Sequence, residues 1–277
     1  MTASARPTLT LASDGDRYLA CWDDASAGHI SCALALVAEG PSLPALSVAG
    51  LWPSLVYSAG AWTLAYGVPG NVAVARVADD GSALGAPVLF GVDQTSPPRA
   101  VITAAPGGFA LLSAPAFDSG QDVRLHLLDS AFASTGAPID LGMKLWIRDA
   151  AAVAVNGAKI AVSVSEPYGS RLFRIEGGVI LGNQFIDGGG KVGSVVALTV
   201  DGASFGRLAQ DDNTGSLTYT TITGDALTVT PQEPEVDHTV VFFNSTFAVM
   251  SIGDDKLFAS TAGSKNDELV VARVRRP

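Results

Sequence analysis

Residues 55–90, LVYSAGAWTLAYGVPGNVAVARVADDGSALGAPVLF, decide the fold because they contain four short apolar segments separated by turns. The segments cover 55–58, 62–66, 71–77 and 87–90. Asp79-Asp80-Gly81, between the third and the fourth, is a typical hairpin turn. Apolar and small side chains alternate along 71–77, as they do on the two faces of a strand. The stretch therefore predicts a sheet of four antiparallel strands.

The same pattern recurs six times along the 277 residues, at intervals of about 46–48 residues. Each copy has a turn with glycine followed by a short apolar run. The glycines are Gly15, Gly60, Gly108, Gly157, Gly202 and Gly253. A period of this length filled with short strands is typical of a β-propeller, whose blades cannot bury their faces alone. We therefore predict an all-β fold in which 1–277 form a single six-bladed β-propeller domain of four-stranded antiparallel blades.

The last copy ends after its third strand, at 269–274, which would leave one sheet edge open. The N-terminal segment 2–6 is the natural candidate to pair with that edge, and we expect it to close the ring. A chain cut short by one strand is the alternative.

The composition restricts partners and location. A net charge of −10 and a pI near 4.6 argue against binding nucleic acid or anionic lipid. Apolar runs stay under ten residues, so we expect no membrane insertion. The segment before Pro7 has no apolar core of a signal peptide, so either the protein is cytoplasmic or a leader is absent from this sequence. Nothing in the sequence indicates an oligomeric state.

Cys21 and Cys32 flank a predicted hairpin with its tip at 25–28, which places them opposite each other on adjacent strands. Opposed residues of such a pair lie near disulfide distance. A disulfide would favour an oxidising compartment, outside the cell or on its surface. The alternative is two small buried thiols in a cytosolic protein.

Residues 14–24, Asp14-Gly15-Asp16-Arg17-Tyr18-Leu19-Ala20-Cys21-Trp22-Asp23-Asp24, resemble a repeat of bacterial, myxobacterial-type secreted and surface β-propeller proteins. That repeat reads Asp-Gly-x-x-Tyr-Leu-x-x-Trp. The second copy is similar to it at 62–66 and 74–81, so the resemblance covers about a third of the chain. It implies a propeller fold and placement outside the cytoplasm. These proteins share no common chemistry, so no catalytic residue transfers.

In propellers the first strand of each blade lines the central channel, and the loops before it share one face with the loops between the second and third strands. Candidate ligand-binding residues on those loops are Trp52, Arg99, Trp146, Arg148, Tyr168 and Lys191. Aromatic planes flanked by arginine suit a glycan or a protein partner. The alternative for Trp52 and Trp146 is that they pack as wedges between blades.

The expected channel strands are nearly free of ionisable side chains, which argues against catalysis. We therefore predict a non-catalytic binding module, with a glycan or protein ligand on the loop face and without catalytic residues, metal or cofactor. One alternative is a hydrolase or lyase that uses Asp93, Asp149 and Asp211 at the channel mouth. Another is a structural component of a surface assembly.

Two features bear on metal binding. His29, His126 and His238 fall in different copies with no ligand spacing, so a shared metal site is not expected. The acidic turn at 211–215 offers oxygen ligands but lacks the later glutamate of a calcium loop. A solvated turn is the favoured interpretation, and calcium binding stays open.

Overall fold

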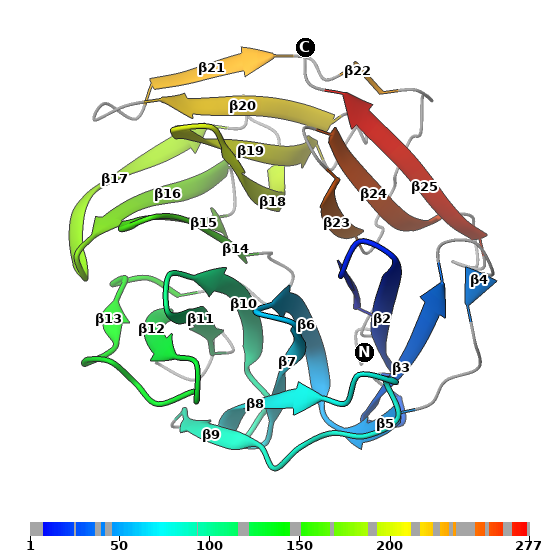
Figure 1. Ribbon diagram of the computed structural model, residues 1–277. Helices are drawn as coiled ribbons and strands as arrows, with labels where there is room; N and C mark the ends of the chain where they lie inside the picture. The colour runs from blue at the N-terminus through cyan, green and yellow to red at the C-terminus, as the bar shows by residue number, and fades with distance from the viewer. Residues whose placement is uncertain are drawn as a thin grey trace. The chain divides into compact units, whose positions relative to one another are not determined.

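The computed structural model describes residues 8–24, 26–36, 40–41, 46–92, 94–115, 122–144, 151–166, 169–187, 193–211, 217–223, 228–232, 235–236, 247–252, 255–262 and 268–275. Within these ranges the regular structure is all β, and the strands form antiparallel sheets (Figure 1). The chain divides into two compact units, Met1–Lys144 and Leu145–Pro277. This confirms the predicted all-β class and its four-stranded antiparallel sheets.

The first unit contains three sheets, which follow one another along the chain. The first has β1 (Leu9–Ser13), β2 (Arg17–Asp24), β3 (His29–Leu36) and β4 (Gly40–Pro41), with β5 (Leu46–Ala49) also paired to β3. The second has β6 (Leu51–Ser58), β7 (Ala61–Val68), β8 (Asn71–Val77) and β9 (Val88–Gly91). The third has β10 (Arg99–Ala105), β11 (Gly108–Ala114), β12 (Arg124–Asp129) and β13 (Ile139–Asp140). Strand β5 was not expected from the sequence.

The second unit contains the other three sheets. The fourth sheet has β14 (Ala151–Asn156), β15 (Lys159–Glu166), β16 (Gly169–Glu176) and β17 (Val179–Asp187). The fifth has β18 (Gly193–Asp201), β19 (Ser204–Asp211), β20 (Leu217–Thr223) and β21 (Thr228–Gln232). The sixth has β23 (Phe247–Ile252), β24 (Asp255–Ala262), β25 (Glu268–Arg275) and β22 (Glu235–Val236).

Strand β22 bears on the predicted closure of the last sheet. It pairs with the last two residues of β25, so Glu235 lies opposite Arg275 and Val236 opposite Val274. At these positions the fourth strand is supplied by residues 235–236, which precede β23 in the chain. The segment 2–6, which we expected there, lies outside the described residues.

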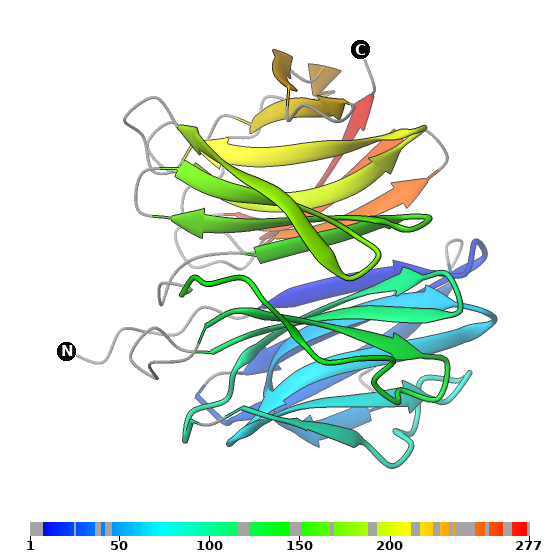
Figure 2. The same ribbon diagram turned by 90° about the vertical axis from the view of Figure 1, so that its left-hand side faces the viewer.

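The sheets of the first unit are stacked on one another (Figure 2). Alternating apolar side chains of their strands form the clusters between them. Leu19 and Ile30 of the first sheet contact a cluster with Trp62 and Leu64 of the second. Hydroxyl groups also join the first strands of neighbouring sheets. Thr10 Oγ1 accepts a hydrogen bond from the Leu55 amide at 3.0 Å, and Ser54 Oγ accepts one from the Ile102 amide at 3.0 Å. Strands β1, β6 and β10 are therefore held side by side.

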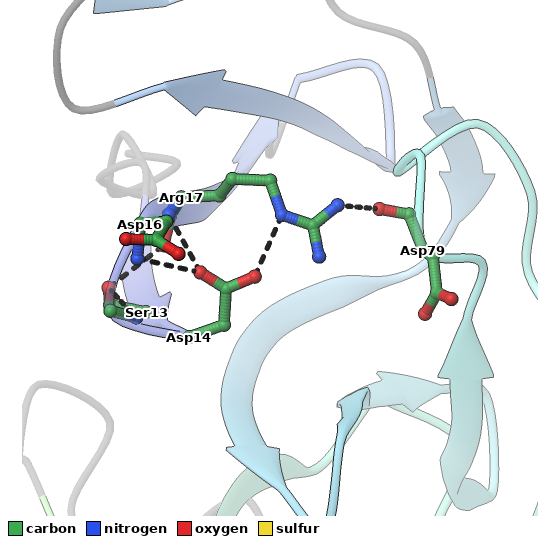
Figure 3. Close-up of polar contacts among 6 residues, drawn as sticks. Ser13, Asp14, Asp16, Arg17 and Asp79 are labelled. Atoms are coloured by element: carbon green, nitrogen blue, oxygen red, sulfur yellow. Dashed lines mark hydrogen bonds and ion pairs between the residues drawn. The ribbon is translucent and has the colours of Figure 1, made fainter.

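The Asp-Gly turn of the first copy is structural. The Asp14 carboxylate accepts hydrogen bonds from the Asp16 and Arg17 amides at 3.0 and 2.7 Å, and from Arg17 Nε at 2.7 Å (Figure 3). Arg17 in turn donates to the carbonyl oxygen of Asp79 at 3.0 Å. The motif that carries the resemblance thus closes a tight turn and links it to the second sheet, which explains why an aspartate suits that position.

Cys21 and Cys32 form the predicted disulfide, and they are directly opposed partners of β2 and β3. Their Cα atoms lie 4.1 Å apart, and both residues are fully buried in the first cluster. The disulfide therefore links the two strands of one hairpin, and Cys21 stands two residues before Asp23 in β2.

Reduction of this disulfide is expected to lower the free energy of unfolding of the first unit by roughly 2–3 kcal/mol, because the cross-link closes a short loop in the unfolded chain. Urea unfolding with and without a phosphine reductant measures the difference. A Cys21→Ser/Cys32→Ser double variant serves as the control, since its stability must not respond to the reductant. Equal stability of the oxidised and reduced parent would contradict the expectation.

Candidate functional site

Three strand ends of the first unit bring Asp23, Trp52 and Arg99 together. Asp23 lies near the end of β2, Trp52 near the start of β6 and Arg99 at the start of β10. Because neighbouring strands within a sheet are antiparallel and β1, β6 and β10 lie side by side, these ends share one edge of the unit. Each of the three sheets thus contributes one side chain.

Asp23 is a buried carboxylate, 1% exposed. One oxygen accepts a hydrogen bond from the Thr8 amide, and the other accepts one from the Trp52 amide at 2.8 Å. Burial raises the pKa of Asp23, while these two amides and the charge of Arg99 act in the opposite direction. With both oxygens held by backbone donors, Asp23 is a positioning residue, which fixes the starts of β1 and β6 relative to each other.

Trp52 adopts a left-handed backbone conformation, with φ of 58°. This is uncommon for a bulky residue and is supported by the surrounding structure. The register of β6 against β7 shifts between Leu51 and Ser54, as in a β-bulge. Gly50 just before it has φ of 154°, and a Cβ there would lie 2.6 Å from the Tyr66 ring. The glycine and the bulge together account for the irregular backbone at the start of β6.

Arg99 covers the indole of Trp52, with its guanidinium carbon 4.3 Å from the ring centroid. Such a cation–π contact fixes both side chains. The backbone just before Arg99 is also tightly packed against β7, because a Cβ on Gly67 would lie 2.1 Å from the Pro98 carbonyl oxygen. Close backbone packing therefore sets where β10 begins.

The arrangement favours recognition of polar, oxygen-rich ligands. A guanidinium presents a planar set of donors that suits carboxylates and vicinal hydroxyl groups. The stacked indole supplies an apolar surface beside it, with one ring face taken by Arg99. Asp23 lies close enough to interact electrostatically with Arg99, whose charge acts to lower the pKa of Asp23 against the larger effect of burial. Both oxygens of Asp23 are occupied by backbone amides, so Asp23 offers neither a free proton donor nor a nucleophile.

Of the predicted ligand-binding residues, the structure brings Trp52 and Arg99 together. Trp146, Arg148, Tyr168 and Lys191 lie outside the described residues, as do Asp93 and Asp149 of the alternative acid set. Asp211 ends β19, and its side chain is not among those described. Asp23 was missed, although a signal existed: it continues the inward-facing series Leu19, Cys21, Asp23, so a charged residue stands at a core position.

The described histidines have ordinary structural surroundings. His126 is buried, and its Nε2 lies 3.0 Å from Ser113 Oγ, with Phe90 against the ring. His29 is half-buried, and His238 lies outside the described residues. Among the side chains that the structure describes, no three His, Cys, Asp or Glu residues gather as metal ligands would. The same part of the chain has no helix with the length and apolarity needed to cross a membrane.

Protonation of His126 is expected to destabilise the first unit at low pH. Burial, with a smaller effect from Arg124, lowers the pKa of His126 to about 4 in the folded state. The unfolded chain binds the proton first, so stability falls as the pH drops from about 6.5 to about 4, by roughly 2 kcal/mol. Urea unfolding between pH 7 and 4 should show this slope in the parent and a flatter one in His126→Gln. Parallel slopes would contradict the assignment.

No protein-family model matches the chain, and the comparison with curated proteins also finds no match. Solved structures do match. The NanB sialidase of Streptococcus pneumoniae superposes with a TM-score of 0.65 at 8% identity, over 98% of this chain and 68% of that one. A subtype N10 neuraminidase-like protein of A/little yellow-shouldered bat/Guatemala gives 0.57 at 10% identity, over 96% and 93%. GH43B of the Bacteroides ovatus xyloglucan PUL gives 0.52 at 10% identity, over 81% and 51%.

At these identities the likeness establishes the fold, which is that of the sialidase and neuraminidase β-propellers. The comparisons contradict the prediction of a non-catalytic binding module, because the matched structures include sialidases and a glycoside hydrolase. The prediction rested on the apolar character of the first strands of the blades. The charged residues of the described site stand instead near strand ends, since Arg99 begins β10 and Asp23 is the second-last residue of β2.

Proposed function

We propose that the protein is a glycan-directed hydrolase with a β-propeller fold, and that its substrate contacts Arg99. The observation that carries the proposal is the Arg99 guanidinium fixed over Trp52 beside the buried Asp23. A fixed cation next to an aromatic surface suits a sugar that bears a carboxylate or closely spaced hydroxyl groups. The shared fold with a sialidase and a glycoside hydrolase supports the same substrate class.

Glycoside hydrolysis needs an acid and a second carboxylate or equivalent nucleophile on either side of the scissile bond. Asp23 does not fill either role, since backbone amides occupy both of its oxygens. We assign the acid and its partner to the set Asp93, Asp149 and Asp211, chosen from the sequence because each is expected on the loop face. Asp93 stands six positions before Arg99 in the chain.

We also propose that the six sheets are the six blades of one closed propeller formed by residues 1–277. The repeat in the sequence and the sheet-by-sheet chain order support it. A secreted or surface location fits the Cys21–Cys32 disulfide, because such bonds persist in oxidising compartments, and it fits the resemblance to bacterial secreted propeller repeats.

The test is hydrolysis of a panel of fluorogenic glycosides, including sialosides, arabinofuranosides, xylosides and glucuronides. We expect one class to be cleaved and Arg99→Ala to lower kcat/KM for it by roughly 10–100-fold, mainly through KM. Replacing the true acid among Asp93, Asp149 and Asp211 by asparagine should lower kcat instead. Arg124→Ala, an exposed arginine of the same sheet, is the matched control. Absence of cleavage across the panel, with the parent confirmed as folded, would overturn the proposal.

A further inference from the structure

Arg207 is a buried charge in the second unit with a single neutral partner. It lies in the middle of β19 and is 5% exposed. The Nη2 group of Arg207 donates a hydrogen bond to Ser170 Oγ on β16 at 2.6 Å. The Nε–H of Arg207 is buried and has no acceptor among the described residues. Within the described ranges no ion pair includes Arg207. Burial lowers the pKa of Arg207 to about 10, so the side chain remains charged at neutral pH. A buried charge compensated by one hydroxyl group is costly.

Hydroxyl groups face Arg207 from the neighbouring sheet. In the register of β15 and β16, Ser165 lies opposite Ser170 and Ser163 lies opposite Leu172. Opposed residues and residues two apart along a strand project from the same face of a sheet, so these four side chains share one face. That face packs against the fifth sheet, since Leu172 belongs to the same apolar cluster as Leu198 and Phe205. Ser163 is fully buried, and its hydroxyl has no hydrogen-bond partner. Two buried donors, on Arg207 and Ser163, therefore lack acceptors in one layer.

A small pocket of about 30 Å³ lies beside this layer, at the strand ends that carry Lys159 and Glu176, and its lining does not include Arg207, Ser163 or Ser170. Leu172 and Phe205 line it, and they stand two residues from Ser170 and Arg207 along their strands. The charged residues at its lining are Lys159, Arg174 and Glu176. Among these described lining residues two are cations and one is a carboxylate, and the pocket shows that packing beside the layer is incomplete.

We propose that the layer between β15–β16 and β19 binds a small monovalent inorganic anion such as chloride, held by Arg207 Nε–H and the hydroxyl groups of Ser163 and Ser170. The anion supplies the charge that Arg207 lacks and accepts the hydrogen bonds that its donors leave unmade. Burial of all three residues limits the ligand to a small ion. The site lies in the second unit and is independent of the proposed hydrolase activity.

The test compares the Tm of the protein in sodium chloride and in sodium gluconate at constant ionic strength, because gluconate is too large for a site among buried side chains. We expect chloride to raise Tm in proportion to the logarithm of its concentration once this exceeds Kd, by roughly 5–10 °C at a hundredfold excess over Kd. Arg207→Met should abolish the difference and be at least as stable as the parent in gluconate. Arg171→Met, on the opposite face of β16, is the control and should retain the response. An equal response in Arg207→Met, or no response in the parent, overturns the proposal.

A bromide-soaked crystal gives an independent result if Arg207→Met does not fold. The expected outcome is an anomalous peak within hydrogen-bond distance of Arg207 Nε, weakened in Ser163→Ala, which keeps the cation and removes one donor. Bromide peaks confined to the molecular surface would contradict the site.

Discussion

Asp23→Ala is expected to lower the free energy of unfolding of the first unit by roughly 3–4 kcal/mol. The substitution removes the acceptor of two amides, those of Thr8 and Trp52, which come from the starts of different sheets. It also removes the charge that faces Arg99. Asp23→Asn should cost less, because one oxygen remains and because burial already disfavours the charged carboxyl group, as its raised pKa indicates.

Urea unfolding monitored by far-UV circular dichroism measures these differences. Asp16→Ala is the matched control, because Asp16 is an exposed carboxylate in the neighbouring turn, and its replacement should change stability by less than about 0.5 kcal/mol. If Asp23→Ala is as stable as this control, Asp23 does not hold β1 and β6 together. In the folded fraction, the same variant should also lose the glycosidase activity expected of the parent, because Trp52 and Arg99 lose their common support.

The fold could be predicted largely from local patterns. Alternation along 71–77 and the Asp79-Asp80-Gly81 turn define β8 and the hairpin after it, and the opposition of Cys21 and Cys32 follows from counting residues on either side of the β2–β3 turn. These features depend on neighbours in the chain. Strand β22 could not be predicted, because two residues have no periodicity, and their partners in β25 lie about 40 residues further along the chain.

The site was predicted only in part, because some of its contacts join residues that are distant in the chain. Trp52 and Arg99 are residue types that stand out in the loops expected from the sequence. The structure places them instead at the starts of β6 and β10, and it brings them together. Asp23 carries no distinguishing motif, and its role depends on amides that are 15 and 29 residues away in the chain. Arg207 was likewise visible only as a departure from the repeat pattern, in a strand where the other copies have apolar residues. In both cases the sequence signal is a charged residue at a strand position where the alternation predicts a buried apolar side chain.

Backbone packing behind Arg99 leads to the second large expected effect. Gly67 of β7 lies against the chain just before β10, and a Cβ there would stand 2.1 Å from the Pro98 carbonyl oxygen and 3.2 Å from the Pro97 Cβ. Neither a carbonyl group nor a proline ring can rotate away as a flexible side chain could. Gly67→Ala must therefore displace the segment that leads into Arg99, with an expected loss of roughly 3 kcal/mol or more.

Gly91→Ala provides the matched control in the same sheet. Gly91 lies in β9, and the nearest atom to its added Cβ would be Asn71 Oδ1 at 3.9 Å, an ordinary contact. Because both variants make the same chemical change in a strand, the difference between their unfolding free energies isolates the collision with Pro98. If the stabilities are equal, β10 can shift without cost, and the Arg99–Trp52 contact is then not fixed by the backbone. If Gly67→Ala alone is destabilised and also raises KM for the cleaved glycoside, the start of β10 is what places the arginine at the site.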